Sequence, residues 1–467
     1  GGAAFWLRAG RLALTASDAA AAIACFTKTL GLERELGLLP PTPTSRARRR
    51  EALAGREEAH RLLGDLASHP GDLDELEKLS EGEPARLADV SIRRAHRMLR
   101  LGDHANASMA TIAAEDHALA ANDDRLRGEA LRVRSEILER LGRFDEALAV
   151  VGVARELFHR QRAVTDEMAA MIGRGRIYVL RGQYELAQEA YRPVVSLIEQ
   201  TGDPWLERIV TNHVAVIELC LGNFTRAMAS VLRSLELCRR YGDRAREVDA
   251  LAVAGIIELE VGLHARASAT FADALAILAH TASRWSRADC LIYAGVCDVH
   301  LGRARGLTML DEALVEARRL GARYLEANAL VSRAGAHLVL GNLAAASADA
   351  AAGTAVAHAA TLVGYEIVGL ARHALAQWRA GARVEAEVLA SRALDLLEHQ
   401  RYVDGCEEVL LVTCAEVLRN TGASDRARVV EERARLSARK KLDGLVDPAW
   451  RAAYAAIPEI RRLLPGG

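Results

Sequence analysis

Cysteine and histidine side chains are the first candidates for chemistry in this chain, because thiolates and imidazoles can ligate a metal. Cys290, Cys297 and His300 are close enough in sequence to share one helix. Cys290 and Cys297 take positions that Ala, Gly or Ile occupy elsewhere in the chain, so we expect buried thiols and no metal site. We expect reduced thiols in a cytoplasmic protein for the whole set: Cys25, Cys220, Cys238, Cys290, Cys297, Cys406 and Cys414.

The compact motifs of nucleotide chemistry and of hydrolysis are absent from the sequence. It contains no Gly-x-x-x-x-Gly-Lys-Ser/Thr loop and no Gly-x-Gly-x-x-Gly turn that would cradle phosphates. It also contains no kinase catalytic loop, no His-Glu-x-x-His and no Gly-x-Ser-x-Gly. The 14 histidines have no Ser or Cys at a motif spacing. We therefore expect no catalysis by this chain and no cofactor.

Polar side chains that recur about every 40 residues within apolar helical patterns are candidates for partner binding. Some stand eight residues before a repeated Gly and others four before it, which places them one turn apart on one helix face. They would form a basic stripe and then an acidic one from Glu218 to Asp298. Either this is a solvated face, or it is a binding groove whose charge changes sign along its length. We call these eleven residues the polar ladder: Arg94, Arg134, Arg174, Tyr178, Glu218, Glu258, Asp298, Arg333, His337, His373 and Gln377.

The elements that must position these residues belong to a repeat of nearly constant length. One copy is the stretch LGRFDEAL at residues 141–148. The spacing of its Gly is identical from Gly102 to Gly302 and afterwards changes by no more than one position. A Gly at such a point is typical of a helix end, where the backbone adopts a left-handed conformation. The repeated glycines are Gly102, Gly142, Gly182, Gly222, Gly262, Gly302, Gly341, Gly381 and Gly422.

Each repeat is expected to be a helical hairpin. The residue five positions after the Gly is usually Ala, and the residue five before it is mostly aliphatic. Small side chains allow two helices to approach closely. The pattern predicts helices of about 16 to 18 residues and an all-α solenoid of about eleven antiparallel helix pairs. Seven positions before the Gly, the residues are all small: Ala95, Ser135, Gly175, Ala215, Gly255, Gly295, Ala334 and Ala374.

The composition agrees with a helical array. The 467 residues are 51% hydrophobic but only 4% aromatic, and the formal net charge is −1. A charge so near zero creates no field that would attract nucleic acid or an anionic membrane. No apolar run reaches the roughly 18 residues of a membrane span, and no signal peptide is visible. Almost all basic residues are Arg, which we interpret as the bias of a GC-rich bacterial genome; the lysines are Lys28, Lys78, Lys440 and Lys441.

Three parts are expected along the chain. Residues 1–83 would form irregular N-terminal hairpins, interrupted by a rigid loop at Pro40 and Pro41. Residues 84–437 would form the regular array. Residues 438–467 would cap the last repeat, with Trp450, Tyr454 and Ile457 suited to cover its open face. Because the chain starts without Met in a helix-like pattern, we expect it to be part of something longer.

The repeat resembles the tetratricopeptide repeat (TPR), with its turn Gly, an aromatic two residues later, an Ala five later and a small residue seven before. The period departs from the family, at about 40 residues instead of about 34. This longer form is similar to the sensor arms of bacterial AAA-type or STAND-type signalling ATPases. The tail, with Ile457-Pro458-Glu459 and Arg461-Arg462, resembles the closing segment of such arms.

The resemblance implies a right-handed superhelix whose concave face binds a protein or peptide. It also implies an upstream ATPase outside these residues, which in such proteins is often fused to a kinase or cyclase module. The alternative is a receptor for a small molecule that regulates such an ATPase. A closed inner cavity with converging Arg and carboxylate groups would favour the receptor, and a wide open groove would favour the scaffold. Neither nucleic acid nor membrane is an expected partner.

Overall fold

A computed structural model describes residues 2–16, 18–35, 42–65, 71–281, 283–399 and 407–464. Within these ranges the chain forms 24 helices and no strand. The expected loop at Pro40 and Pro41, and the thiol of Cys406, lie outside the described residues. None of the described helices is both long and apolar enough to cross a membrane.

The helices follow one another with short connections. Their bounds are α1 (Gly2–Thr15), α2 (Ala19–Glu35), α3 (Pro43–Leu63), α4 (Gly71–Leu79), α5 (Pro84–Leu101), α6 (His104–Ala120), α7 (Asp124–Arg140), α8 (Phe144–Arg160), α9 (Val164–Leu180), α10 (Tyr184–Thr201), α11 (Pro204–Cys220), α12 (Phe224–Arg240), α13 (Arg244–Glu260), α14 (His264–Leu278), α15 (Arg284–His300), α16 (Arg305–Arg319), α17 (Arg323–Val339), α18 (Leu343–Ala359), α19 (Val363–Arg379), α20 (Arg383–His399), α21 (Glu407–Thr421), α22 (Ser424–Gly444), α23 (Pro448–Ala456) and α24 (Pro458–Leu463).

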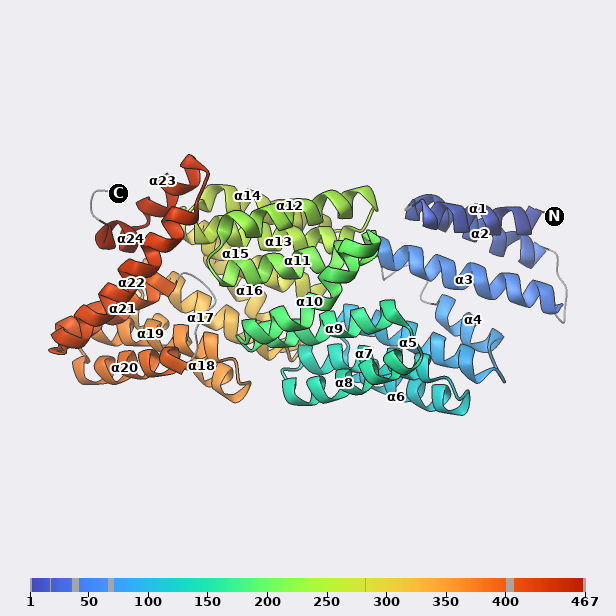
Figure 1. The fold of residues 1–467 in the computed structure, drawn as a ribbon, viewed down its shortest axis with the longest axis horizontal. Coiled ribbons are helices and arrows are strands. Elements are labelled where there is room, and N and C mark those ends of the chain that lie inside the picture. The colour runs from blue at the N-terminus through green and yellow to red at the C-terminus, as the bar shows by residue number, and fades with distance from the viewer. Residues whose placement is uncertain are drawn as a thin grey trace.

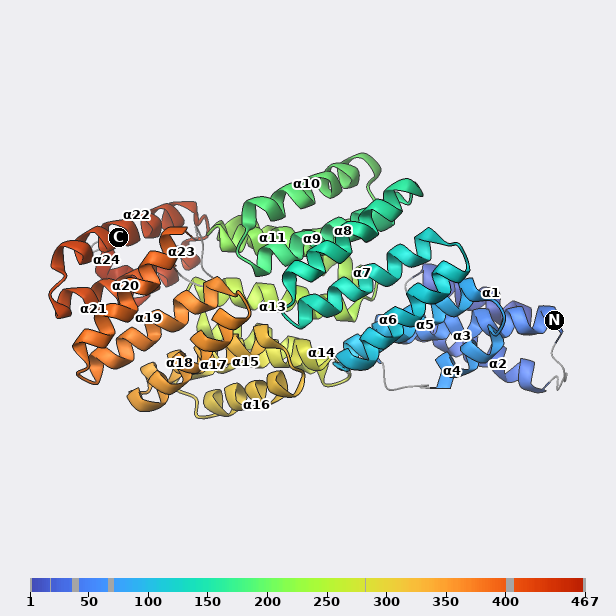
Figure 2. The same ribbon diagram turned by 90° about the horizontal axis from the view of Figure 1, so that it is seen from below.

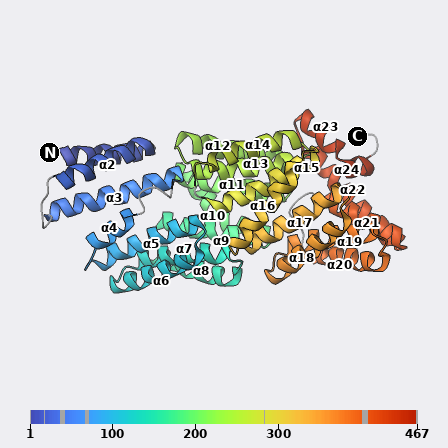
Figure 3. The same cartoon turned by 180° about the vertical axis from the view of Figure 1, so that it is seen from behind.

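Helices α1 to α22 pair into eleven hairpins, which confirms the all-α solenoid of about eleven helix pairs. Each hairpin packs on the next, and the stack winds into an elongated TPR-like superhelix with its termini at opposite ends (Figure 1 and Figure 3). Helix α5 begins at Pro84, where the regular array was expected to start, whereas α22 continues past residue 437 to Gly444. The division of the chain into three parts stays a prediction.

Close approach of the two helices explains the geometry of a hairpin. The turn Gly142 has a φ of 75°, a left-handed conformation that ends α7 and lets α8 return at once. Five residues later, Ala147 is fully buried. In α13, a Cβ atom on Gly255 would lie only 2.7 Å from the ring of Phe271 in α14. The small residue before each turn therefore makes room for the bulky side chain of the second helix.

Successive turns of the superhelix touch each other. Helix α13 lies against α3 and α15 against α5, although the members of each pair are far apart along the chain (Figure 2). The turn at Gly102 meets Leu320, and the turn at Gly142 meets Ala360. Both partners directly follow the second helix of a later hairpin, α16 and α18 respectively. We call this line of contacts the seam.

The C-terminal helices extend the seam. Helix α24 packs on α21 and α22 and so covers the last hairpin. Tyr454 of α23 reaches back to Phe224 of α12, with ring centres 6.2 Å apart. The hydroxyl of Thr225 donates a hydrogen bond of 2.9 Å to the carbonyl of Gly444. The tail therefore binds one superhelical turn back as well as to its own neighbour.

The close packing at the small positions predicts opposite effects for two Gly→Ala changes. A Cβ atom on Gly295 of α15 would lie 2.8 Å from the backbone carbonyl oxygen of Gly306 in α16. Gly295→Ala should therefore overpack the hairpin and lower the free energy of unfolding by about 1–3 kcal/mol. A Cβ atom on Gly152 of α8 would meet nothing within 4 Å. Gly152→Ala should raise the stability by about 0.5–1 kcal/mol.

Urea unfolding followed by circular dichroism measures both effects. Equal effects of the two substitutions would contradict the hairpin packing described above.

Candidate ligand-binding cavity

A cavity of about 960 Å³ lies inside the superhelix. Nearly all of its lining comes from the first helices of the hairpins, the odd-numbered helices from α1 to α19. The second helices form the outside. Because the seam brings α13 and α15 against α3 and α5, the cavity is walled by consecutive turns of the superhelix.

The lining residues occupy fixed positions relative to the turn Gly. Arg100 and Arg140 stand two before it, Arg176 six before, and Asp249 and Asp289 thirteen before. Steps of three and four residues keep side chains on one face of a helix, here the face that points inward. The ladder positions, four and eight before the Gly, fall off this face.

None of the eleven residues of the polar ladder lines the cavity. Glu258 is 2% exposed and accepts a hydrogen bond of 2.7 Å from Thr270 of its own hairpin. Asp298 is 1% exposed and pairs with Arg303 at 2.9 Å. Helical phase explains this, since these positions point toward the second helices. The ladder is therefore not part of the cavity wall. A partner-binding role for it stays a prediction.

Most of the other ladder residues contact neighbouring outer helices or turns, whereas Arg174 and Tyr178 bond to each other within α9. Arg333 pairs with Asp349 at 2.7 Å, and His337 approaches the same carboxylate at 3.7 Å. The remaining pairs are Arg94 with Asp74 at 2.8 Å, Arg134 with Glu115 at 3.8 Å, Arg174 with Tyr178 at 3.0 Å and Glu218 with Asn223 at 2.7 Å. His373 and Gln377 are half-buried on α19.

One side of the cavity is a network of matched charges on α7 and α9. Arg132 pairs with Glu129 at 2.6 Å, and Arg176 pairs with Glu139 at 2.7 Å. Burial raises the pKa of Glu129, but the charge and hydrogen bonds of Arg132 outweigh burial and hold this pKa well below its ordinary value. Glu129 therefore stays ionised, and the two carboxylates hold the arginines in place.

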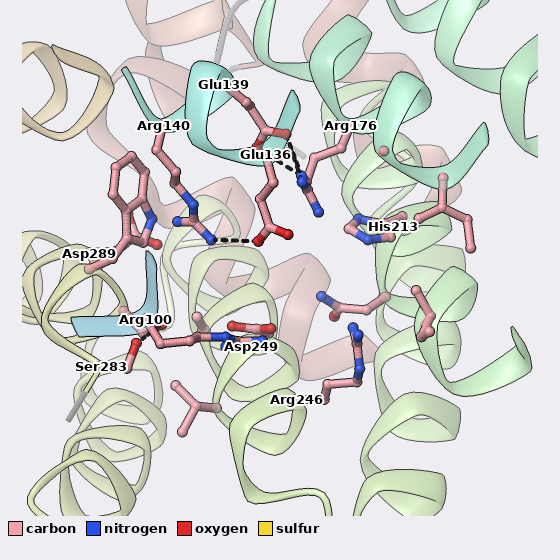
Figure 4. Close-up of a pocket in the computed structure, with 18 of the residues that line it drawn as sticks. Arg100, Glu136, Glu139, Arg140, Arg176, His213, Arg246, Asp249, Ser283 and Asp289 are labelled. Carbon is pink, nitrogen blue, oxygen red and sulfur yellow. Dashed lines mark hydrogen bonds and ion pairs between the residues drawn. The ribbon is translucent and has the colours of Figure 1, made fainter. Parts of the chain in front are cut away.

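Four charged groups that line the cavity are poorly matched (Figure 4). Arg140 reaches Glu136 only at 3.9 Å, and burial lowers its pKa. Asp289 has a buried Oδ1 atom without a hydrogen-bond partner, and burial raises its pKa to about 7. Burial likewise raises the pKa of Asp249, against the opposing influence of Arg100. Neither Arg100 nor Asp249 makes an ion pair or hydrogen bond within the described part of the chain.

Aromatic rings flank the acidic side. Trp285 and Tyr293 stand one turn before and one turn after Asp289 on α15, and both line the cavity. Tyr324 of α17 stacks on Trp285 with ring centres 6.3 Å apart. The guanidinium carbon of Arg140 lies 4.2 Å from the centre of the Trp285 ring, so α7 touches α15 across the cavity. The wall combines apolar surface with a few charged groups, as ligand pockets do.

Four of the described cysteines are core residues, whereas Cys25 and Cys220 are half-buried. Cys290 and Cys297 are buried, and burial raises the pKa of both thiols, in Cys297 to about 12. His300 stacks on His264 with ring centres 4.5 Å apart. Across the residues that the structure describes, no three His, Cys, Asp or Glu side chains form a group that could hold a metal.

Sequence reasoning missed the cavity residues, although a signal for them exists. Aliphatic and small residues five and seven before each Gly mark the face that packs on the second helix. The inward face must lie to the other side, at two, six, nine and thirteen before the Gly. Charged residues occur there in only some repeats, for example Arg100, Glu136, Arg176 and Asp249, so they do not form a uniform column.

Neither a family model nor a curated protein matches this chain. The solved structures similar to it include a signal transduction ATPase with numerous domains (STAND) with a TPR sensor from Pyrococcus horikoshii. That similarity has 17% identity and a TM-score of 0.46, over 82% of this chain and 56% of that chain. The chain thus spans little more than half the length of that protein, to whose class the sequence pattern also bears a resemblance.

Two further structures are similar in helical architecture. One is a Rap protein complexed with competence and sporulation factor, at 12% identity and a TM-score of 0.39, over 95% of this chain and 99% of that chain. The other is aspartyl phosphate phosphatase F from Bacillus subtilis, at 12% identity and a TM-score of 0.45, over 76% of this chain and 93% of that chain. Similarities of this size assign no function to the chain.

The raised pKa of Asp289 predicts a specific dependence of stability on pH. The folded chain binds this proton more tightly than the unfolded chain, whose Asp pKa is about 3.9. The resulting stabilisation is complete below about pH 4 and is lost as the pH rises through about 7. Asp289→Asn removes this dependence. As the pH rises from 5 to 8, the free energy of unfolding of the variant should therefore increase relative to that of wild type by about 1–3 kcal/mol.

The measurement is urea unfolding of both proteins across this pH range, so that other titrating groups cancel in the difference. Asp273→Asn, at an exposed position on α14, is the matched control and should show no such gain. A difference between Asp289→Asn and wild type that stays constant with pH would contradict the burial of this carboxyl group.

Proposed function

We propose that this chain is a non-catalytic sensor arm whose inner cavity binds a metabolite or a short peptide. The observation that carries the proposal is the cavity of about 960 Å³ in which Arg100, Arg140, Asp249 and Asp289 converge without full partners. Buried charges without partners destabilise a folded chain. A protein that keeps them in a cavity gains their interaction energy when a ligand enters.

The size of the cavity favours one of the two candidate functions. Pockets for small ligands have volumes of about 300–1,000 Å³, and this cavity is at the upper end of that range. Contacts along the seam, such as Gly102 with Leu320, bring the successive turns together. A folded protein partner needs an interface of roughly 800 Å² on each side, which favours an open surface. The volume of the cavity therefore supports the small-ligand receptor over the protein-binding scaffold.

The proposal also includes a protein partner, which would bind at a surface separate from the cavity. The polar ladder lies between inner and outer helices, apart from the cavity. It is proposed as the surface through which the arm contacts a protein, including an ATPase or kinase module of a longer polypeptide. Its half-buried arginines, such as Arg94 and Arg134, still reach solvent, and charges near a surface set association rates and salt dependence more than affinity.

Filling the cavity should abolish ligand binding. Ala169 of α9 lines the cavity, and Ala169→Trp would place an indole there. In native mass spectrometry, wild-type chain incubated with a filtered bacterial extract of metabolites and short peptides should form a 1:1 complex. Ala169→Trp should lose this complex. Ala120→Trp, at the exposed end of α6, should retain it. The proposal is wrong if wild type forms no complex, or if Ala169→Trp forms the same one.

The isolated chain should neither hydrolyse nor bind ATP. Phosphate recognition needs a cluster of backbone N–H groups and a Lys on a glycine-rich loop, and the sequence has no such loop. Phosphate release and calorimetry with Mg-ATP on the purified 467-residue chain test this expectation. Turnover that survives further purification and persists in Ala169→Trp would overturn the non-catalytic assignment.

A further inference from the structure

We propose that the ligand of the inner cavity is a zwitterion, with an ammonium group bound by Asp289 and a carboxylate bound by Arg140 and Arg100. This inference rests on the proposed function, because it names the chemistry of the molecule that enters the same cavity. The probes that suit it are free amino acids and short peptides with unblocked ends.

The acidic half of the site is Asp289. Its Oδ1 atom is buried and has no hydrogen-bond partner, so it lacks the donor that such an atom requires. The charged groups that face it are Arg140 from α7, which favours the ionised carboxylate, and Asp249 from α13, which opposes it. Neither comes within ion-pair distance. A ligand ammonium supplies three donors and the opposite charge at this point.

Aromatic rings reinforce the preference for a cation at this position. Trp285 and Tyr293 lie on the same face of α15 as Asp289, one turn to either side. Tyr293 is fixed because its hydroxyl accepts a hydrogen bond of 3.2 Å from Asn328. Rings next to a carboxylate lower the local dielectric and so strengthen the attraction of the carboxylate for a cation. The binding of Arg140 over Trp285 at 4.2 Å shows that the wall accepts a cation.

The basic half of the site is formed by Arg140 and Arg100. Arg140 has one distant carboxylate, Glu136 at 3.9 Å, for five N–H donors. Arg100 has no hydrogen-bond or ion-pair partner in the described ranges, although its charge acts on Asp249. Both guanidinium groups lie at the ends of inner helices and line the cavity (Figure 4). A carboxylate can accept two parallel hydrogen bonds from a guanidinium group.

The two halves come from opposite walls, which is why both charges are needed. Helices α5 and α7 supply the arginines, and α13 and α15 supply the aspartates. Arg140 and Asp289 carry opposite charges that influence each other, but they form no ion pair, although Arg140 reaches Trp285 on the same helix as Asp289. A ligand with one charge would satisfy one wall and leave the other unpaired. A zwitterion satisfies both and adds no net charge to a buried site.

The test is isothermal titration calorimetry with two matched sets of probes. One set is leucine, 3-methylbutylamine and 4-methylpentanoate. The other is trialanine, N-acetyl-trialanine and trialanine amide. In at least one set, the zwitterion should bind wild-type chain at least tenfold more tightly than either single-charge relative. Its binding at pH 7 should release protons, because an ammonium group displaces the proton of Asp289.

Variants separate the two halves of the site. Asp289→Asn should weaken the zwitterion at least tenfold, abolish proton release and leave the acid probe unchanged. Arg140→Met should weaken the zwitterion similarly and leave the amine probe unchanged. Asp273→Asn, outside the cavity, should bind as wild type does. Circular dichroism establishes that each variant is folded.

The failure of this inference is distinct from failure of the proposed function. If wild type forms the extract complex that Ala169→Trp loses, but zwitterions bind no better than single-charge probes, the zwitterion is overturned and the receptor stands. Unchanged zwitterion affinity in a folded Asp289→Asn also overturns it. If no extract complex forms and no probe binds, both proposals fall together.

Discussion

The structure depends on the close approach of two helices in each hairpin. A left-handed turn such as that of Gly142 and a buried Ala such as Ala147 fix the distance between the helices. Because the same contacts recur in every repeat, each hairpin is rotated on its neighbour by a similar amount. Repeated rotation in one direction produces a superhelix, and here its successive turns are near enough to bring Gly102 against Leu320. A local packing rule thus determines a contact between residues that are far apart in sequence.

The cavity follows from this proximity of successive turns. Inner helices that face an open groove would leave their charges in bulk water, where Arg100 and Asp249 would interact weakly. When the next turn covers them, the same charges are partly desolvated, and burial shifts the pKa of Asp249 and of Asp289 upward. The matched pairs on α7 and α9, such as Arg176 with Glu139, stabilise the wall without a ligand. The unmatched groups are the part of the wall to which we assign the proposed ligand.

The architecture could be predicted from the sequence, and the site could not. Fixed spacing of Gly and small residues determines hairpins, since these contacts are local and repeat. The polar ladder consists of positions that are similar between repeats, and the cavity residues are not among them. Two of its members, Glu258 and Asp298, point toward outer helices because of their place on the helix. In the site, Arg100 acts on the charge of Asp249 and Arg140 on that of Asp289, without an ion pair in either case. The same length of chain separates the two residues in both cases. Only the number of hairpins in one superhelical turn determines that length, and no local pattern encodes it.

This dependence on superhelical pitch also links the cavity to the rest of the molecule. Arg140 on α7 and Trp285 on α15 belong to different turns, and the seam at Gly142 and Ala360 joins the same two turns from outside. A ligand that bridges Arg140 and Asp289 therefore acts on the same degree of freedom as the seam, the distance between turns. The contacts between turns, such as those of α13 with α3 and of α15 with α5, are sparse compared with those inside a hairpin, so the array deforms most easily along this coordinate. If the proposed ligand binds there, its binding is therefore coupled to the spacing of the turns and can be transmitted to the ends of the array.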